Sequence, residues 1–368
     1  MKKILIVGNN DGGLYLFRAE LVKRLLDEGF EVHFTVPYGE KVEPLKAMGA
    51  VYHEIDVDRR GMNPKKDLKL VADYKKLFKQ VNPDAMLTYT VKPNVYGGMI
   101  AQNMRIPYIA TITGLGSALQ GEGIKSKLIK LLYKKGLKDS NFVFFQNSQN
   151  RDFFLDNRIV EESKIRQVRG SGVNTDKFTP RRENHTGVNF LFISRIMKEK
   201  GAEEYIEVAK RLKPQYPNAN FQILGYYDES YLEEKVKEGV EKGVLQYLGV
   251  SGDTRKEMSQ ADCIVLPSYH EGMSNVILEG ASFGLPLITT NIHGCKEAVE
   301  DGETGFLCEP KSADSLIGAI VKFLELTPEQ RCNMGEKGRI KMIREFDRKP
   351  GYFKERKVTV LDIKHMGV

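Results

Sequence analysis

The sequence predicts an α/β protein with two open, doubly wound parallel sheets, one in each half of the chain. At 368 residues the chain exceeds one ordinary hydrophobic core, so two domains are expected. Short β-rich runs alternate with amphipathic stretches in both halves, which is the pattern of βαβ units. Glycine, proline and polar residues replace this pattern over residues 169–187. We therefore expect a linker or hinge there.

The first half repeats strand-like and helix-like segments in turn. In chain order these are KILIVGN, LYLFRAELVKRLLDEG, EVHFTVP, EKVEPLKAMG, VYHEIDV, a helical pattern over 65–81, AMLTYT, a helix near 94–104, PYIATIT, a basic helix and NFVFFQN. Eight evenly repeated units are not seen, so the sequence favours an open, twisted sheet over a closed barrel.

The second half restarts the alternation after the hinge. Its segments are NFLFISRI, GAEEYIEVAKRLK, NFQILGY, YLEEKVKEGVEKG, VLQYLG, CIVLPS, NVILEGASFG and PLITTN. Ligands of doubly wound sheets bind outside the carboxyl ends of the strands. Two such domains facing each other are therefore expected to form a deep binding cleft.

The composition is that of a soluble globular protein, with 41% hydrophobic and 29% charged residues. No apolar stretch approaches the roughly 18 residues that span a bilayer, and the start MKKILIVGNN turns polar too soon for a signal peptide. We expect a cytoplasmic protein. The four cysteines form no C-x-x-C pair, so reduced thiols are expected instead of a zinc site or a disulfide framework.

The positive charge is concentrated in the first half. The whole chain carries a net charge of +7, and residues 1–180 contain 29 Lys and Arg against 20 Asp and Glu. Nucleic acid is not the expected partner, because the basic stretches lack interleaved aromatic residues and no known nucleic-acid-binding signature occurs.

The stretch SYHEGMSNVILEG, residues 268–280, places two carboxylates where a strand ends and a helix begins. A helix is expected over about 276–283, capped by Ser274 or Asn275. Its first amide N–H groups and the positive end of its dipole suit an anion. Glu271 and Glu279 either accept hydrogen bonds from the hydroxyls of a sugar or a ribose, or only complement the helix dipole.

The sequence around these glutamates resembles a known family. The E-x7-E pattern after LPSYHEG, the following EGASFGLPLITTNIHGCKEAVEDGETGFLCEP, the hinge GSGVNTDKFTP and SRIMKEKGAEEYIEVAKRL are similar to the retaining GT-B glycosyltransferases of family 4, also called glycosyl transferases group 1. That family builds bacterial polysaccharides and glycolipids. The resemblance covers essentially the whole chain. It implies an acceptor-side domain over 1–180, a donor-binding domain over 181–346, and a segment 347–368 that crosses back to the first domain.

The resemblance implies a nucleotide-sugar donor, with uridine as the commonest base of the family. Glu271, Arg195 and Lys200 correspond to the catalytic group, with the two basic residues on the diphosphate. The further residues implied in donor binding are Gly12, Gly13, Gly249, Val250, Gly272, Met273, Ser274, Asn275 and Glu279. Fixed cations and N–H dipoles stabilise the charge that builds on a departing diphosphate, so no metal cofactor is expected.

A metal-dependent alternative has one candidate motif. The DVD run over 56–58 has the D-x-D spacing used by glycosyltransferases of a different fold. Arg59 and Arg60 follow it at once, and it lies in the half opposite the donor site. We interpret it as a strand end with solvated acids.

The acceptor-side candidates lie after strands of the first half. They are Arg59, Arg60, Lys92, Asn94, Thr113 and Gly114. Many family members have a histidine where this chain has Thr113 and Gly114, so a commonly cited active-site group is missing. Arg59 and Arg60 stand before a predicted helix start, where they serve either as a solvated basic entry or as contacts to an acceptor pyrophosphate.

Residues 124–138 form a basic amphipathic helix with six lysines and no acid. Ile124, Leu128, Leu131 and Leu132 occur at helical spacing. The helix either lies on an anionic membrane surface or packs its apolar face on the sheet. Because a lipid-linked acceptor would arrive there, we favour peripheral association with the cytoplasmic face of the membrane.

The resemblance thus implies a retaining glycosyltransferase that moves a sugar from a nucleotide diphosphate donor, with a UDP-sugar as the expected donor, to a hydroxyl of a lipid-linked saccharide. No carboxylate is evident as a nucleophile, so same-face attack is preferred to a covalent intermediate. Two alternatives stay open: a nucleotide-sugar epimerase of the same architecture, which would need an acid and a base on the sugar, and a non-catalytic nucleotide-sugar-binding protein.

Overall fold

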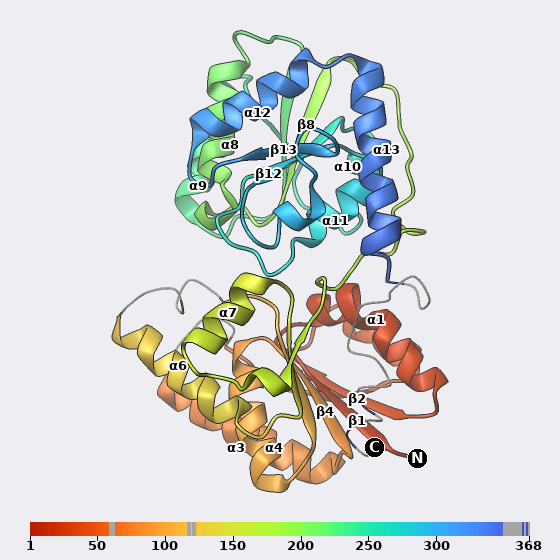
Figure 1. Ribbon diagram of the computed structural model, residues 1–368, viewed down its shortest axis with the longest axis vertical. Coiled ribbons are helices and arrows are strands. Elements are labelled where there is room, and N and C mark those ends of the chain that lie inside the picture. The colour runs from red at the N-terminus through yellow and green to blue at the C-terminus, as the bar shows by residue number, and fades with distance from the viewer. Residues whose placement is uncertain (59–62, 116–118, 120–122, 349–362, 364–365, 367–368) are drawn as a thin grey trace. The chain divides into compact units, whose positions relative to one another are not determined.

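The computed structural model describes residues 1–58, 63–115, 119, 123–348, 363 and 366. The chain forms two compact units (Figure 1), which we describe separately. Unit 1 comprises Met1–Ser171 with Glu355–Val368, and unit 2 comprises Gly172–Lys354. The boundary therefore lies earlier than the residue 180 expected from the sequence. Val173 and Phe178 belong to the apolar core of unit 2.

Unit 1 contains a seven-stranded parallel sheet of order β3-β2-β1-β4-β5-β6-β7. Its strands are β1 Lys3–Val7, β2 Glu31–Val36, β3 Val51–Glu54, β4 Ala85–Tyr89, β5 Tyr108–Ile112, β6 Phe142–Phe145 and β7 Ile165–Gln167. Its helices are α1 Asp11–Asp27, α2 Val42–Ala47, α3 Pro64–Val81, the π-helix η1 Pro93–Gly97, α4 Gly98–Met104, α6 Ile124–Leu137, α7 Ser148–Asp156 and the short 3₁₀ helix η2 Glu162–Lys164.

Helices cover both faces of this sheet, with α1 on one side and α3, α4 and α6 on the other (Figure 1). Successive residues of a strand point to opposite faces. Accordingly, Ile4 and Ile6 pack in the cluster with the buried side of α1, and Leu5 and Val7 pack in the cluster with α3. This two-sided burial explains why the strands appear in the sequence as continuous apolar runs.

The end of the chain contributes one described residue to the unit 1 core. Ile363 is fully buried in the same cluster as Ile4 and Ile6. Most of the predicted crossing segment 347–368 lies outside the described residues.

Unit 2 contains a six-stranded parallel sheet of order β10-β9-β8-β11-β12-β13. Its strands are β8 Val188–Ile193, β9 Ala219–Leu224, β10 Gln246–Tyr247, β11 Cys263–Leu266, β12 Leu287–Thr290 and β13 Gly305–Cys308. Its helices are η3 Lys198–Lys200, α8 Ala202–Leu212, α9 Ser230–Glu241, α10 Arg255–Met258, α11 Asn275–Ser282, η4 Lys296–Ala298, α12 Ala313–Glu325 and α13 Pro328–Glu345.

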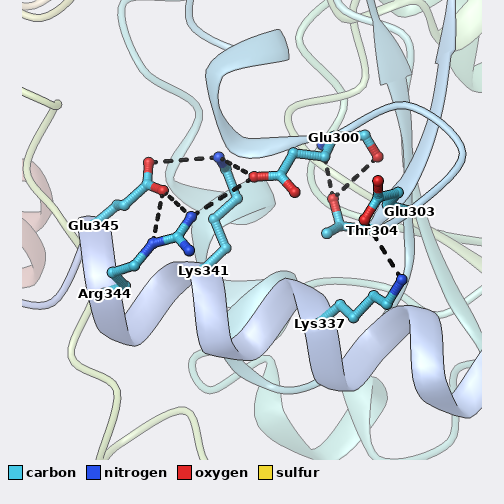
Figure 2. Close-up of polar contacts among 7 residues, drawn as sticks. All are labelled: Glu300, Glu303, Thr304, Lys337, Lys341, Arg344 and Glu345. Carbon is cyan, nitrogen blue, oxygen red and sulfur yellow. Dashed lines mark hydrogen bonds and ion pairs between the residues drawn. The ribbon is translucent and has the colours of Figure 1, made fainter.

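Helix α13 is fixed to the loop before β13 by ion pairs (Figure 2). The mostly buried Lys341 ammonium lies 3.0 Å from a Glu300 carboxylate oxygen and 3.4 Å from one of Glu345. Lys337 and Glu303 form a second, exposed pair. At its start, α13 has a reciprocal capping box between Thr327 and Gln330. These contacts hold the polar edge of the helix while its apolar side joins the core.

Among the described residues, no helix is both long and apolar enough to pass through a lipid bilayer.

Candidate functional site

The strand order of unit 2 reverses between β8 and β11, and ligands of doubly wound sheets bind at such a switch point. Two loops leave the sheet there. One, residues 194–201, follows β8 and contains Arg195 and Lys200, and the other, residues 267–274, follows β11 and contains Glu271. The structure therefore brings together at one sheet edge the three residues that the sequence predicted as the catalytic group.

The two loops are tied together through their backbones. The Tyr269 amide donates to the Glu199 carbonyl at 2.9 Å. Gly201 has a φ of 74°, and a Cβ atom there would lie 2.2 Å from the Pro267 carbonyl oxygen. Only glycine fits this approach without displacing the backbone of the second loop. Lys200, the preceding residue, is consequently held against the end of β11.

Lys200 and Glu271 form a largely buried ion pair. The ammonium nitrogen lies 2.6 Å from Glu271 Oε1, and the two side chains are only 16% and 12% exposed. The Ser268 hydroxyl donates to the same carboxylate oxygen at 2.9 Å. Because removing one partner would leave a charge in a poorly solvated place, the pair is strongly coupled. It presents one fixed cation and one fixed anion at the edge of the sheet.

A third loop supports the start of α11. The Ser274 amide donates to the Gly294 carbonyl at 2.8 Å. Gly294 has a φ of 91°, and a Cβ atom there would lie 2.8 Å from the carbonyl oxygens of Glu271 and Gly272. Ser274 is the N-cap of α11 and makes no side-chain capping bond. The loop thus orients the first turn of the helix from behind.

The predicted amide groups of 272–275 lie in this first turn and the loop before it. Gly272, Met273 and Ser274 are buried, and Asn275 begins the helix. Amides of a first turn lack partners within the helix and attract anions. The side-chain oxygen of Asn275 is buried with no hydrogen-bond partner among the described residues. An incoming hydroxyl or amide would satisfy it.

Arg195 is oriented by Asp228. Its Nη1 atom lies 3.0 Å from Asp228 Oδ2, and the arginine side chain is 39% exposed whereas the aspartate is 7% exposed. The guanidinium therefore has a fixed anchor and an accessible remainder. The sequence had not identified Asp228, although its place in the YYD run after β9 is a signal that could have found it.

Glu279 is partly buried one turn into α11. Burial raises its pKa to about 7, an effect opposed by the charges of Arg348 and Lys177 and assisted by that of Asp253. These three charged neighbours come from distant points of the chain, so spacing in the sequence could not reveal them. Near neutral pH the carboxyl group is balanced between its two protonation states.

Gly249 and Val250, two of the residues predicted in donor binding, follow β10. The Gly225 amide donates to the Gly249 carbonyl at 2.8 Å, and the Tyr247 hydroxyl donates to the Gly225 carbonyl at 3.0 Å. Gly225 is pressed against the Ser194 carbonyl, which leaves no room for a Cβ atom. Val250 is 66% exposed beside them. The segments after β9 and β10 are therefore joined to each other, and Gly225 lies against the loop that carries Arg195.

Gly12 and Gly13 belong to unit 1, in the first turn of α1. The Asn10 side chain caps this helix by accepting from the Gly13 amide at 2.5 Å. A Cβ atom on Gly13 would lie 2.9 Å from that accepting oxygen. The second glycine therefore makes room for the helix cap. A role of the pair in donor binding stays a prediction.

Two acceptor-side candidates serve inside unit 1. Asn94 is fully buried: its side-chain oxygen accepts from the Thr88 hydroxyl at 2.7 Å, and its amide donates to the Thr111 carbonyl at 2.9 Å. It joins β4 to β5 and is not available to a ligand, which corrects the expectation. The Lys92 ammonium nitrogen lies 2.7 Å from Asp67 Oδ1 of α3, and both side chains are mostly buried.

The remaining acceptor-side candidates are less constrained. Thr113 and Gly114 follow β5 and are partly exposed, with a φ of 157° at Gly114. Arg59 and Arg60 lie outside the described residues. Asp58 of the DVD run lies 3.4 Å from the exposed Lys66. No cluster of three or more potential metal-ligating side chains occurs in the described part of the chain, and independence from metals stays a prediction.

Of the four predicted apolar residues of helix α6, Leu132 is partly buried against the core of unit 1, whereas the other three are exposed. The buried positions of the helix are Ser126, Ile129, Tyr133, Gly136 and Leu137. Gly136 allows the close crossing with η1, because a Cβ atom there would lie 2.6 Å from Val95 backbone atoms. By contrast, Ile124, Leu128 and Leu131 are 87%, 44% and 50% exposed. The alternative in which this apolar stripe packs on the sheet is therefore excluded for these three residues.

Two family models match the chain, one in each unit. The model of glycosyl transferases group 1 matches residues 174–341, and the glycosyl transferase 4-like model matches residues 3–147.

Two curated bacterial relatives act on diphosphoundecaprenol-linked sugars according to their names. The N,N'-diacetylbacillosaminyl-diphospho-undecaprenol alpha-1,3-N-acetylgalactosaminyltransferase of Campylobacter jejuni is 29% identical over 341 residues, 88% of this chain and 89% of the relative. The UDP-Gal:alpha-D-GlcNAc-diphosphoundecaprenol alpha-1,3-galactosyltransferase of Escherichia coli is 28% identical over 280 residues, 70% of each chain.

Solved structures share the fold along nearly the whole chain. Anabaena HepE, crystallised with UDP and glucose, has a TM-score of 0.78 at 16% identity and covers 100% of this chain and 98% of its own. A glycosyltransferase from Rickettsia africae has a TM-score of 0.76 at 21% identity, with 94% of each chain covered. Two parallel sheets of this kind, with these neighbours, define the GT-B fold. Each unit thus matches a glycosyltransferase family model, glycosyl transferases group 1 in unit 2 and glycosyl transferase 4-like in unit 1.

Proposed function

We propose that this glycosyltransferase moves a sugar from a UDP-sugar to a hydroxyl of a diphosphate-lipid-linked saccharide and retains the anomeric configuration. The observation that carries the proposal is the buried Lys200–Glu271 pair at the unit 2 switch point, beside the first turn of α11. The names of the Campylobacter and Escherichia relatives support the lipid-linked acceptor, and that of the HepE complex supports the nucleotide.

The fixed cations act on the leaving group. The bond between the anomeric carbon and the diphosphate oxygen breaks, and negative charge develops on that oxygen. Lys200, the exposed part of Arg195 and the first-turn amides of α11 are the groups that stabilise it. Because they are held by Glu271, Asp228 and the Gly294 loop, little reorganisation is needed during the reaction.

The carboxylates hold the donor. Glu271 accepts hydrogen bonds from the sugar hydroxyls while it keeps Lys200 in place, and Glu279 accepts from the ribose. The acceptor hydroxyl attacks the same face of the sugar from which the diphosphate departs, and its proton passes to the departing phosphate oxygen. The proposed reaction therefore needs neither a covalent enzyme intermediate nor a metal ion.

Helix α6 brings the protein to the membrane. Its exposed Ile124, Leu128 and Leu131 enter the lipid interface, and the surrounding lysines pair with anionic headgroups. The protein is then peripherally associated with the cytoplasmic face, where a lipid-linked acceptor is held.

The decisive experiment incubates the purified protein with a panel of UDP-sugars, with and without diphosphoundecaprenol-linked saccharides in detergent. UDP release that requires the lipid-linked acceptor supports the transferase, and NMR of the product then gives the anomeric configuration. Conversion of one UDP-sugar into another without acceptor would establish the epimerase instead. Binding of UDP-sugars with no turnover would leave the non-catalytic protein. Chelator in parallel reactions tests the expected independence from metals.

A further inference from the structure

Thr90, the first residue after β4, has an unusual backbone conformation. Its φ is 73°, in the left-handed region that β-branched residues rarely adopt. Four other non-glycine residues of the described chain have positive φ values: Asn82, Arg105, Arg158 and Lys311. Asn82 and Arg105 cap the ends of α3 and α4, where this conformation is common. Thr90 lies at no helix end of this kind, so its strain has another cause.

The surroundings of Thr90 hold the strained backbone in place. The Thr90 carbonyl accepts from the Asn94 amide at 3.1 Å. On one side, Tyr89 is buried beneath the Arg18 guanidinium, 4.7 Å from its ring centre. On the other, Lys92 is paired with Asp67 and Asn94 is locked between β4 and β5. Strain persists only where neighbours determine it to this extent, and it gathers at functional sites.

The Thr90 side chain carries a second cost. Its hydroxyl is buried and has no hydrogen-bond partner among the described residues, although the residue as a whole is partly exposed. A buried hydroxyl without a partner opposes folding. Glycine would remove both costs at this position. A residue that is unfavourable for stability in two independent ways is expected to serve binding or catalysis.

The position of Thr90 in the sheet indicates what the strained residue does. The strand order of unit 1 reverses between β1 and β4, so Thr90 lies at the switch point of its own sheet, as Lys200 and Glu271 do in unit 2. We infer that Thr90 is a positioning residue for the acceptor: the left-handed turn holds it at this edge, and its hydroxyl exchanges its buried place for a hydrogen bond to an acceptor sugar hydroxyl.

The inference rests on the proposed function and deepens it on the acceptor side. Three variants separate the backbone from the hydroxyl. Thr90→Gly relieves the strain and removes the hydroxyl, Thr90→Val keeps the shape but removes the hydroxyl, and Thr90→Ser keeps the hydroxyl. Arg105→Gly is the matched control, because it relieves a positive φ at a helix end away from the switch point.

We expect Thr90→Gly to leave Tm unchanged or higher while kcat/KM for the lipid-linked acceptor falls about tenfold or more, the usual effect of one lost hydrogen bond. Thr90→Val should lose as much, and Thr90→Ser should stay within about threefold of the wild type. The KM for the UDP-sugar should not change in any variant. Arg105→Gly should show the Tm effect alone.

Full activity of Thr90→Val would overturn the inference, as would parallel losses of Tm and activity in Thr90→Gly. Direct binding of diphosphoundecaprenol-linked monosaccharides in detergent distinguishes the two levels of the proposal. Binding by the wild type that Thr90→Val weakens, without transfer, would overturn only the proposed function. Transfer that is indifferent to Thr90 would overturn only the inference, and neither binding nor transfer by the wild type would overturn both.

Discussion

The two units have the same strand arrangement at their centres, β2-β1-β4 in unit 1 and β9-β8-β11 in unit 2, but they use polar residues at the switch point differently. In unit 2, glycines with positive φ let the loops approach closely, and they hold a charged pair at the edge. In unit 1, the side chains of Asn94 and Lys92 make contacts within the unit, and the residue with the strained backbone is Thr90.

This difference shows that two sheets with the same strand order can carry chemically different residues at their switch points. Unit 2 presents preset charges, which suit a substrate whose own charge changes during reaction. In unit 1, Lys92 at the corresponding edge is paired with Asp67, and the exposed apolar residues lie elsewhere, on the basic helix α6.

The largest expected effect tests the charged pair. Lys200→Ala should lower the rate of UDP release by about 10²–10³-fold, because the leaving diphosphate loses a fixed cation. Glu271→Gln should also abolish most transfer, since it releases Lys200 and weakens the hold on the sugar. Steady-state assays with a UDP-sugar and a lipid-linked acceptor measure both.

The matched control for this pair is Lys210→Ala, which removes a more exposed lysine–glutamate pair between α8 and α9. It should leave transfer unchanged. If the folded Lys200→Ala protein turned over at nearly the wild-type rate, the fixed charges at the switch point of unit 2 would have no catalytic role, and the contrast with unit 1 would not hold.

The next effect concerns the internal role of Asn94. Asn94→Ala should destabilise unit 1 by about 2–4 kcal/mol, because the Thr88 hydroxyl and the Thr111 carbonyl lose their buried partner and a cavity remains. Hydrogen exchange of the amides in β4 and β5 measures the loss. UDP affinity should be retained. If the Asn94→Ala protein were as stable as the wild type and lost only its use of the acceptor, Asn94 would be assigned to the acceptor site after all.

A smaller effect is expected at the exposed stripe of α6. The double substitution of Leu128 and Leu131 by Ser should weaken sedimentation with phosphatidylglycerol vesicles by about tenfold or more, since each leucine would otherwise bury part of its side chain in lipid. Because both residues are about half exposed, Tm should not change. Ile340→Ser, at a 61% exposed position of α13, is the control and should not affect vesicle binding.

Glu279 should give unit 2 a particular pH dependence. Its folded-state pKa is raised to about 7, so the folded state holds the proton more tightly than the unfolded state. This contribution is fully present below about pH 4.5 and is lost as the pH rises through 7. Glu279→Gln should therefore flatten the fall of unit 2 stability over this window, an effect of about 1–3 kcal/mol. Thermal unfolding at pH 5–8 tests it, and an unchanged slope would contradict the burial.

His53 should act in the opposite direction in unit 1, with the smallest effect. Burial, and then the neighbouring His33, lower its pKa, so the unfolded state binds the proton more readily. Its contribution to stability is present above the unfolded pKa of about 6.5 and is lost as the pH falls through the folded pKa. His53→Gln should reduce the acid sensitivity of unit 1, measured by exchange of β2 and β3 amides at pH 5–7. The same sensitivity in the variant would assign it to other groups.

Much of the site followed from local sequence. The alternation of apolar runs and amphipathic stretches predicted both sheets, and the stretch 268–280 predicted α11 to within one residue at each end. Local signals suffice there because strand burial and helix capping depend on neighbouring residues. The segments after residue 291 were not predicted as elements, although they form η4, β13, α12 and α13.

Other features depended on residues that are distant in the chain. The exposed side of α6 could not be chosen from its pattern, because apolar residues occur on both sides and only the crossing of Gly136 with η1 decides which is buried. Likewise, Asn94 looked available in the sequence, and its satisfaction by Thr88 and Thr111 appears only when β4 and β5 pair.

The sequence alone determined the doubly wound architecture and the identity of the charged residues after β8 and β11. Tertiary structure decided which of those charges are paired, which glycines are required and where strain resides. The reason is that periodicity and capping act over a few residues, whereas ion pairing, desolvation and close backbone approach depend on segments that only the folded sheet brings together.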